Sequence, residues 1–396
     1  MRAMEYVEEI CRFKQRGPGT PAEWAAADYV QGKMEEMGME TRRFVTRIYP
    51  RFNVLYSVYA LAVAGAAFLS PFHPLVALPI GLAGAFFYWG DLSLRFRLPR
   101  ELLPQVKTPH VEGRLARPGA SRVVYLCGHL DTARSGLIFE PSSAERSARL
   151  FKRLLGSAPS VFLPVFACQL GLLALVAMRL FGLNGPAWWA AVALLALPQV
   201  VLSFFLLEFE RNPYVEGAND NASALGVALS VAERYGGSDL NGLELRVLAV
   251  GSEETMMQGM FKLMKKLRRE LDRDDTYFIV LDSVGVGELR YVTGEGMIGV
   301  RKYRPELPEL CARLAAREKH AGVKPYVIKF GTDAAVPNLF GYPAISLTSL
   351  NQDDYAPNYH WPTDTVENLD EKSLLQAEGF VLDMLEELAV SAGPGG

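Results

Sequence analysis

The chain of 396 residues lacks the cysteine pattern of a disulfide framework or a zinc finger. Its four cysteines are widely separated, and none belongs to a CxxC pair. This usage is typical of proteins kept in a reducing compartment. The net charge is only −3, so no global electrostatic attraction to nucleic acid is expected. The N-terminal sequence MRAMEYVEEICRFKQRG has no apolar run, and no cleaved signal peptide is predicted.

Four long stretches are almost free of charged residues. Residues 53–90 contain no Asp, Glu, Lys or Arg, and the SPFHP turn divides them into two apolar blocks. A second pair begins near Pro159 and is divided by the turn GLNG. The blocks are about 17 to 20 residues long, which is enough to span a bilayer. We therefore predict two transmembrane helical hairpins, at 52–90 and 158–207, instead of helices buried in a soluble core.

Basic residues are concentrated in the polar segments that flank these hairpins. They are Arg42, Arg43, Arg47, Arg51, Arg95, Arg97, Arg100, Arg146, Arg149, Lys152 and Arg153. The turns inside the hairpins carry almost no positive charge, with Arg179 as the exception. The positive-inside rule therefore predicts a multi-pass membrane protein whose termini and long polar segments all lie in the cytoplasm.

Three polar segments remain when the hairpins are set aside: 1–51, 91–157 and 208–396. The runs VVYLCGHLD, LELRVLAV, TYFIVLD and YPAISLTSL are predicted to be buried strands, and helical patterns lie between them. Near the N-terminus, Thr20, Pro21 and Glu23 predict the start of a helix with a capping box, in which the Glu23 side chain returns to the Thr20 N–H. The alternation predicts an α/β fold with a mostly parallel central sheet flanked by helices. No segment completes the sheet alone, so one domain interrupted twice is expected.

Several predicted strands and loops end in side chains that commonly bind metals. These are His129 and Asp131 after the first strand, Glu253 and Glu254 after the second, Asp282 after the third, Asp220 in the loop GANDN, and His360 near the C-terminus. The carboxyl ends of parallel strands meet at one edge of a sheet. Two imidazoles and several carboxylates without a thiolate favour a divalent ion such as zinc.

The motifs GHLDT, GANDNAS, GSEE, VLDSVG and YHWPTDTVENLD occur in one order along the chain. In order and wording they resemble the co-catalytic di-zinc aminopeptidases of metallopeptidase family 28, which includes bacterial leucyl aminopeptidases and aminopeptidase Y. The resemblance covers almost all of the polar sequence. It implies a zinc-exopeptidase-like three-layer sandwich, with a peptidase domain made from 1–51, 91–157 and 208–396 and interrupted by the two hairpins.

The resemblance also implies a role for each motif residue. His129 and Asp282 would bind one zinc ion, Glu254 and His360 the other, and Asp220 would bridge both. Cobalt or manganese could take the place of zinc.

Two further residues receive roles from the same resemblance. Asp131 would hold the imidazole of His129, and Glu253 would be the general base that takes a proton from the metal-bound water. The expected reaction is removal of N-terminal residues from peptides with a free amino terminus.

The sequence departs from the family pattern at two positions. Ala224 stands where the family usually has glycine, close to a helix start where alanine fits. Ala334 follows Asp333 in place of a histidine, which leaves the metal ligands intact but alters the expected substrate pocket. Tyr355 and Tyr359 flank His360, either as pocket residues or as packing residues.

Alternative functions remain open at this point. A family relative with other chemistry is the first, such as a carboxypeptidase or a glutaminyl cyclase, which relies on a single zinc. A membrane receptor or scaffold without catalysis is the second, and a transporter is disfavoured because the apolar blocks hold almost no ionisable residue. The five intact ligands favour two metals and hydrolysis. The hairpins could hold the site near peptides at the membrane surface, or only anchor or oligomerise the enzyme.

Overall fold

The computed structural model describes residues 2–117, 119–157, 160–238 and 242–390. The helices are α1 (Arg2–Cys11), α2 (Pro21–Glu36), α3 (Phe52–Leu69), α4 (Pro74–Leu92), α5 (Leu98–Leu102), α6 (Pro141–Leu155), α7 (Phe162–Arg179), α8 (Pro186–Phe209), α9 (Ser223–Gly236), α10 (Gln258–Leu267), α11 (Glu306–Ala315), α12 (Ala335–Leu339) and α13 (Glu371–Val390). The strands are β1 (Glu40–Ile48), β2 (Val106–Leu115), β3 (Arg122–His129), β4 (Leu243–Val250), β5 (Thr276–Leu281), β6 (Glu288–Glu295), β7 (Arg301–Lys302), β8 (Lys324–Ile328) and β9 (Ala344–Leu350). Short helical segments are η1 (Leu137–Phe139), η2 (Ala218–Ala222), η3 (Glu318–His320) and η4 (Val366–Asn368).

One sheet runs through the domain in the order β1-β2-β4-β3-β5-β9-β6-β7, with β8 paired to β6. Its centre, β4-β3-β5-β9, is parallel, and these are the four strands predicted from the sequence. The ladders β1–β2, β2–β4, β9–β6 and β6–β7 are antiparallel. The predicted α/β fold is confirmed, and the sheet is mixed: parallel where the site forms and largely antiparallel towards its edges.

Several strands towards the edges were not predicted, and β1 shows why. In ETRRFVTRI charged side chains alternate with apolar ones, and only Phe44, Thr46 and Ile48 are buried. A strand at a sheet edge needs one apolar face only, so its charge density resembles that of a helix surface or a loop. β2 adds Pro109 and His110 to an otherwise buried strand, which weakens the strand signal in the same way.

Helices cover both faces of the sheet, as the three-layer prediction requires. On one face, Gly128 of β3 lies against Ala224 of α9, and Gly113 of β2 lies against Met34 of α2. On the other face, α10 approaches β2, because a Cβ at its Gly259 would meet the His110 ring. α13 packs on α9, and α1 packs mainly on α9 and also touches α13 and α2. Ala224 therefore fits its position, as expected.

The predicted helix start at Thr20 is confirmed, but its capping pattern differs in one respect. The Thr20 hydroxyl accepts a hydrogen bond from the Glu23 N–H at 3.3 Å, and Pro21 occupies the first turn. The Glu23 carboxylate does not return to the Thr20 N–H. It is fully buried and accepts hydrogen bonds from the Gly19 N–H and the Thr108 hydroxyl instead.

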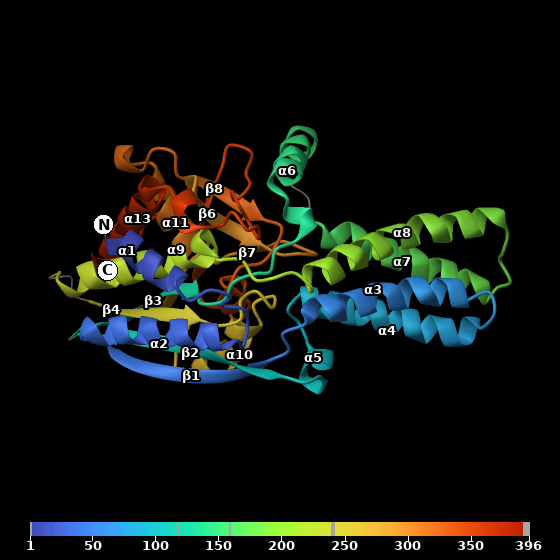
Figure 1. The fold of residues 1–396 in the computed structure, drawn as a ribbon, viewed down its shortest axis with the longest axis horizontal. Helices are drawn as coiled ribbons and strands as arrows, with labels where there is room; N and C mark the ends of the chain where they lie inside the picture. The colour runs from blue at the N-terminus through green and yellow to red at the C-terminus, as the bar shows by residue number, and fades with distance from the viewer. Residues whose placement is uncertain (1, 118, 158–159, 239–241, 391–396) are drawn as a thin grey trace.

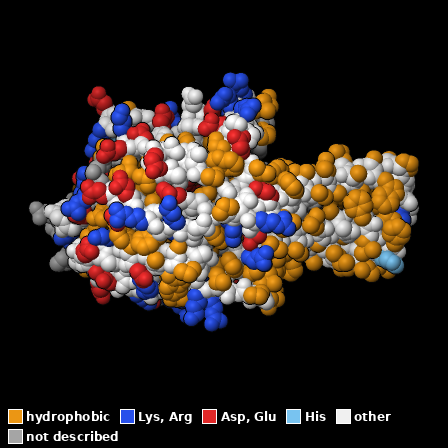
Figure 2. Space-filling model, viewed as in Figure 1, with side chains coloured by type: hydrophobic (Ala, Val, Ile, Leu, Met, Phe, Trp, Pro, Cys, Tyr) orange, Lys and Arg blue, Asp and Glu red, His pale blue; other side chains and the backbone are white. Residues whose placement is uncertain are grey.

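The two predicted hairpins are α3–α4 and α7–α8, and they project together from one end of the domain (Figure 1). All four helices are long and apolar enough to cross a membrane. Their surface is dominated by hydrophobic side chains, in contrast to the charged surface of the domain (Figure 2). Arg179 donates hydrogen bonds to the Leu183 and Pro71 carbonyls and so joins the two outer turns.

The hairpins interrupt the domain at the same end of the sheet. Ile48 at the end of β1 pairs with Val106 at the start of β2, so the first hairpin is inserted where a tight β-turn would suffice. The second hairpin follows β3, the strand that ends in His129. Both insertions therefore leave from segments next to the carboxyl ends of the central strands.

Gly84 on α4 sets the distance between the two helices of the first hairpin. A Cβ at Gly84 would lie 2.9 Å from the Tyr59 carbonyl oxygen on α3, whereas a Cβ at Gly65 would meet nothing within 4 Å. We expect Gly84→Val to lower the free energy of unfolding by about 1–3 kcal/mol because the backbone of α3 must move away. Gly65→Val is the matched control and should be nearly neutral. Thermal denaturation of both variants in detergent checks this, and equal midpoints would contradict the packing.

Candidate metal centre

The carboxylate of Asp220 lies between two imidazoles at the centre of the candidate site. Its Oδ1 is 3.1 Å from His129 Nε2, and its Oδ2 is 3.2 Å from His360 Nε2. His360 Nε2 is also 3.3 Å from Glu254 Oε2. All four side chains are at most one-tenth exposed, so this is an interior cluster and not a surface ion pair.

The ligand-type atoms of the cluster form overlapping groups. One group is His129, Asp220 and Asp282, and another is Asp220, Glu254 and His360; within each, the atoms lie within 4.8 Å of one another. Asp220 belongs to both, one oxygen facing each histidine. A third group joins Glu253 to His129 and Glu254. The structure thus brings together every metal ligand predicted from the sequence, with Glu253 beside them.

The electrostatics of the cluster are those of a site built for cations. Burial opposes ionisation of Asp220, but the adjacent His129 and His360 imidazoles outweigh burial and lower its pKa. Burial raises the pKa of Glu254 to about 7, and burial with the charge of Asp220 raises the pKa of Asp282 to about 6. Burial opposes protonation of His360, yet the Glu254 and Asp220 carboxylates raise its pKa to about 10. Without a cation, this cluster balances its charge by holding protons.

The residues fit a divalent metal by their chemistry. Two imidazoles and three carboxylates are a donor set suited to zinc. Glu254 Oε1 is buried without a hydrogen-bond partner in the described structure, as are both ring nitrogens of His360. Buried polar atoms without a hydrogen-bond partner destabilise the fold. A bound metal would displace the protons from the cluster and could be coordinated by these unpaired atoms.

Asp131 acts on the site in a different way from the one implied by the resemblance. The Nδ1 of His129 lies 2.9 Å from the backbone carbonyl oxygen of Asp131 and 3.7 Å from its carboxylate. The neutral ring would therefore donate Nδ1–H to the carbonyl and leave Nε2 free to bind metal. The carboxylate of Asp131 points instead at the loop that follows β4.

That loop, SEETMM (252–257), is held at its start by two buried acids. Asp131 accepts hydrogen bonds from the N–H groups of Glu253 and Glu254, both at 2.9 Å. Glu23, from the distant helix α2, accepts the Ser252 N–H at 2.9 Å. This role of Glu23 was not predicted, because its place in the helix cap already accounted for the residue.

The second half of the same loop is held by two buried arginines from the root of the first hairpin. Arg100 donates to the Thr255 carbonyl at 2.6 Å, and Arg97 donates to the Met256 carbonyl at 2.7 Å. Both guanidinium groups pair with Asp91 at the end of α4, at 2.7 Å from Arg100 and 3.4 Å from Arg97. The hairpin is thus hydrogen-bonded to the segment that carries Glu253 and Glu254.

The backbone of this loop explains why so many contacts meet there. Ser252, Met256 and Met257 have φ angles of 59°, 63° and 55°, in the left-handed region that disfavours side chains. Such residues each cost on the order of 1–3 kcal/mol and persist only where the surroundings hold them. The hydrogen bonds that Asp131 and Glu23 accept, and those that the two arginines donate, supply that constraint.

The Asp220 loop is fixed by residues that the sequence also left unmarked. Asp364 accepts the N–H groups of Asn219 and Asp220, at 2.7 and 3.1 Å. Arg16, 1 % exposed, donates to the Gly217 carbonyl and to the Leu130 carbonyl, both at 3.0 Å. Arg16 thereby ties the segment after His129 to the loop that carries Asp220. Only the resulting fold brings these segments together, so no local pattern could have shown it.

The second hairpin reaches the site through aromatic rings. Phe209, at the end of α8, lies with its ring 5.8 Å from the His360 ring, and Phe139 of η1 lies 4.8 Å from it. Tyr359 stacks on His360 at 3.7 Å between centroids. Tyr359 is therefore a packing residue for the histidine, one of the two roles left open by the sequence.

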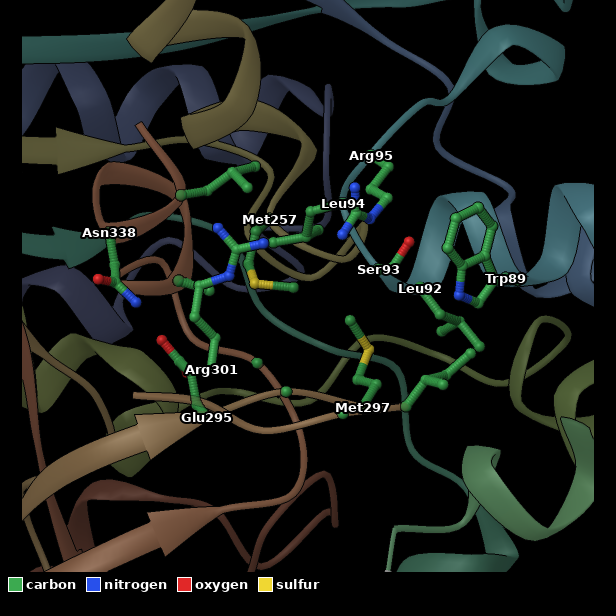
Figure 3. A pocket seen from close by; sticks show the side chains of 16 residues that line it. Trp89, Leu92, Ser93, Leu94, Arg95, Met257, Glu295, Met297, Arg301 and Asn338 are labelled. Atoms are coloured by element: carbon green, nitrogen blue, oxygen red, sulfur yellow. The ribbon is translucent and has the colours of Figure 1, made fainter. Parts of the chain in front are cut away.

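A cavity of about 230 Å³ lies between the root of the first hairpin, the SEETMM loop and the segment that ends β6 (Figure 3). Trp89 and Arg95 line it from the hairpin, and Met257, Glu295 and Met297 line it from the domain. Burial raises the pKa of the Glu295 carboxyl to about 8.

Asp333, the residue before Ala334, lies close by. Thr332 precedes Asp333 in the chain, and its N–H donates a hydrogen bond to the Glu295 carboxylate at 2.7 Å. Both Asp333 oxygens are buried without a hydrogen-bond partner in the described ranges. Burial raises the pKa of Asp333. Asp333 is thus a further buried acid beside the cluster, and no role was predicted for it.

Comparison with known proteins agrees with the family resemblance that the motifs indicate. Residues 206–385 match the model of peptidase family M28, and the predicted resemblance is confirmed over this segment. No curated protein matches the chain significantly.

Solved structures share the fold. A leucine aminopeptidase precursor and a glutaminyl cyclase bound to N-acetylhistamine, both from Bacteroides thetaiotaomicron, each give a TM-score of 0.56 at 14% identity, over 97% of this chain and 96% of theirs. A Zn-dependent exopeptidase from Parabacteroides distasonis gives 0.54 at 14% identity, over 97% of each chain. The zinc-exopeptidase-like fold is therefore confirmed, and it hosts more than one activity.

The buried arginines at the hairpin root allow a test of the loop geometry. We expect Arg97→Met to lower turnover at least tenfold, because the Met256 carbonyl loses its donor and the strained loop can relax. Arg97→Met keeps the ion pair between Asp91 and Arg100, so the protein should still fold. Arg95→Met, in the same segment but exposed, is the control. Steady-state kinetics and thermal denaturation check both, and an Arg97→Met protein with normal kcat would show that the loop holds its shape without this contact.

Proposed function

We propose that the protein is a membrane-anchored di-zinc aminopeptidase. The observation that carries this proposal is the Asp220 carboxylate, which offers one oxygen to each of two ligand groups and so suits a bridging ligand. His129 and Asp282 would complete one ion's protein ligands, and Glu254 and His360 the other's. The family match and the aminopeptidase neighbour support peptide hydrolysis from a free N-terminus.

The ions, when bound, would supply a water of lowered pKa and polarise the scissile carbonyl. Glu253 would take the proton from that water and later give it to the leaving amine. Its neighbour Glu254 holds metal, and the Asp131 carboxylate fixes the backbone of both. The two adjacent glutamates would thus have different roles: Glu253 would accept the proton, and Glu254 would bind metal.

Anchoring by the two hairpins is part of the same proposal. The four helices have the length and composition of membrane spans. The basic residues that flank them favour a cytoplasmic catalytic domain. Because both hairpin roots contact catalytic loops, at Met256 and at His360, the site would lie close to the membrane surface. Peptides held at that surface are the substrates that such a position favours.

A glutaminyl cyclase is the second candidate, because a cyclase matches the fold as well as the aminopeptidase does. The cyclase reaction consumes no water, since the α-amine attacks the glutamine side chain. The five converging candidate ligands favour two metal ions and hydrolysis, whereas a glutaminyl cyclase would need only one zinc ion. Product analysis of a peptide with N-terminal glutamine separates the two: release of glutamine supports the peptidase, and loss of ammonia supports the cyclase.

The role of Glu253 yields the most direct catalytic prediction. We expect Glu253→Gln to bind metal as the wild type does but to lose activity by a factor of about 10² to 10⁴, the usual contribution of a general base. Assays on aminoacyl substrates with free and with acetylated N-termini should show cleavage of the free form only, abolished by a chelator and restored by zinc. Glu270→Gln, at the surface, is the control. Normal turnover by Glu253→Gln would show that Glu253 is not the general base.

Membrane orientation can be tested by labelling. We expect an impermeant maleimide added to intact cells to label Asn184→Cys, in the exposed turn between α7 and α8, but not Lys372→Cys on the catalytic domain. After cell lysis both should react. Labelling of Lys372→Cys in intact cells would place the domain outside and refute the cytoplasmic assignment.

A further inference from the structure

Helix α6 stands apart from the layers of the domain. It projects beside the root of the second hairpin and runs across the direction of the hairpin helices (Figure 1). Glu140 caps its first turn by accepting the Ser142 and Ser143 N–H groups, and Gly156 ends it in the left-handed conformation. Only Ala148 is buried among its described side chains, so most of its surface is unused by the domain.

The exposed surface of α6 is divided into an apolar edge and a basic edge. Leu150 and Leu154, one turn apart, are 53% and 69% exposed, and Phe151 lies beside them. The helix carries one acidic residue, Glu145, and four basic residues: Arg146, Arg149, Lys152 and Arg153. At 3.6 residues per turn, the leucines and the basic residues fall on adjoining arcs. Hydrophobic side chains appear on the hairpin side of this projection and basic ones at its tip (Figure 2).

Exposed apolar side chains also flank α6 along the chain. Leu137 and Ile138 of η1 precede α6 and are exposed, and Val161 and Leu163 follow it at the start of α7 and are exposed as well. A surface of this kind, next in the chain to a helix that would enter the membrane, would lie at the level of the lipid headgroups. Basic residues next to exposed leucines are complementary to anionic phospholipids.

α6 is also connected to the metal centre. Arg149 pairs with Asp353 at 3.1 Å, and Lys152 pairs with Asp354 at 2.8 Å. These aspartates belong to the loop that leads to His360. Any surface that fixes α6 thereby also acts on the approach to a metal ligand.

We infer that α6 is a membrane-surface helix whose leucine edge lies in the lipid interface and whose Arg146 and Arg153 bind anionic phospholipid headgroups. The inference rests on the proposed anchoring by the hairpins. It gives the chain a third membrane contact, one that depends on lipid charge and borders the loop of His360.

Fluorescence of a dye in lipid nanodiscs tests this contact. The full-length protein, with Cys168→Ala to remove the half-buried thiol, carries an NBD dye on Leu154→Cys. With phosphatidylglycerol present we expect a blue-shifted emission and strong quenching by lipids with a spin label near the headgroup. Leu375→Cys on α13 is the exposed control and should stay unquenched. Arg146→Gln with Arg153→Gln should reduce the quenching at position 154 at least twofold.

A dye on Leu194→Cys of α8, measured with lipids that carry the spin label on the acyl chain, separates the inference from its premise. If position 194 is protected from water and quenched while position 154 behaves like position 375, the hairpins insert and the proposed role of α6 is wrong. Equal quenching at 154 in discs of pure phosphatidylcholine would overturn the headgroup assignment. Protection at 154 without quenching by lipid would also overturn it, because a protein surface would then cover the helix. An unquenched position 194 would refute the anchoring itself.

Discussion

The burial of several carboxylates in one small volume is the constraint on which this structure depends. Asp220, Glu254, Asp282 and Glu253 lie together with two imidazoles in the interior of the domain. Isolated buried charges of this kind are far too costly to keep, so each must be protonated, paired or bound to a cation. The imidazoles can compensate only part of the negative charge. A pair of divalent ions would compensate the rest and would turn a destabilising cluster into a catalytic one.

The geometry of that cluster is maintained by segments from every part of the chain. Glu23 from the N-terminal region and Arg97 with Arg100 from the first hairpin fix the SEETMM loop from opposite ends. Phe209 from the second hairpin packs against His360. The hairpins are therefore integrated with the catalytic end of the sheet, and an anchor that only tethered the domain would need no such contacts.

The sequence predicted well which side chains lie together at the candidate metal centre, because strand ends and the order of motifs can be recognised locally. His129, Glu254 and Asp282 each follow a central parallel strand, and such ends necessarily converge. The charged edge strand β1 was missed, since one exposed face hides the strand pattern. Arg16, Asp364 and the hairpin arginines were missed for another reason: they act on backbone groups of distant segments. For Asp131 the position was predicted, but its main partners are backbone amides of the glutamate loop, which only tertiary structure reveals.

The central claim is that Asp220 bridges two cations. Anomalous diffraction at the zinc edge, from crystals of the full-length protein supplied with zinc, tests it most directly. The account predicts two peaks about 3.5–4 Å apart, the spacing of two-metal hydrolases, with the Asp220 carboxylate between them. A single peak, or two peaks that Asp220 does not join, would contradict it.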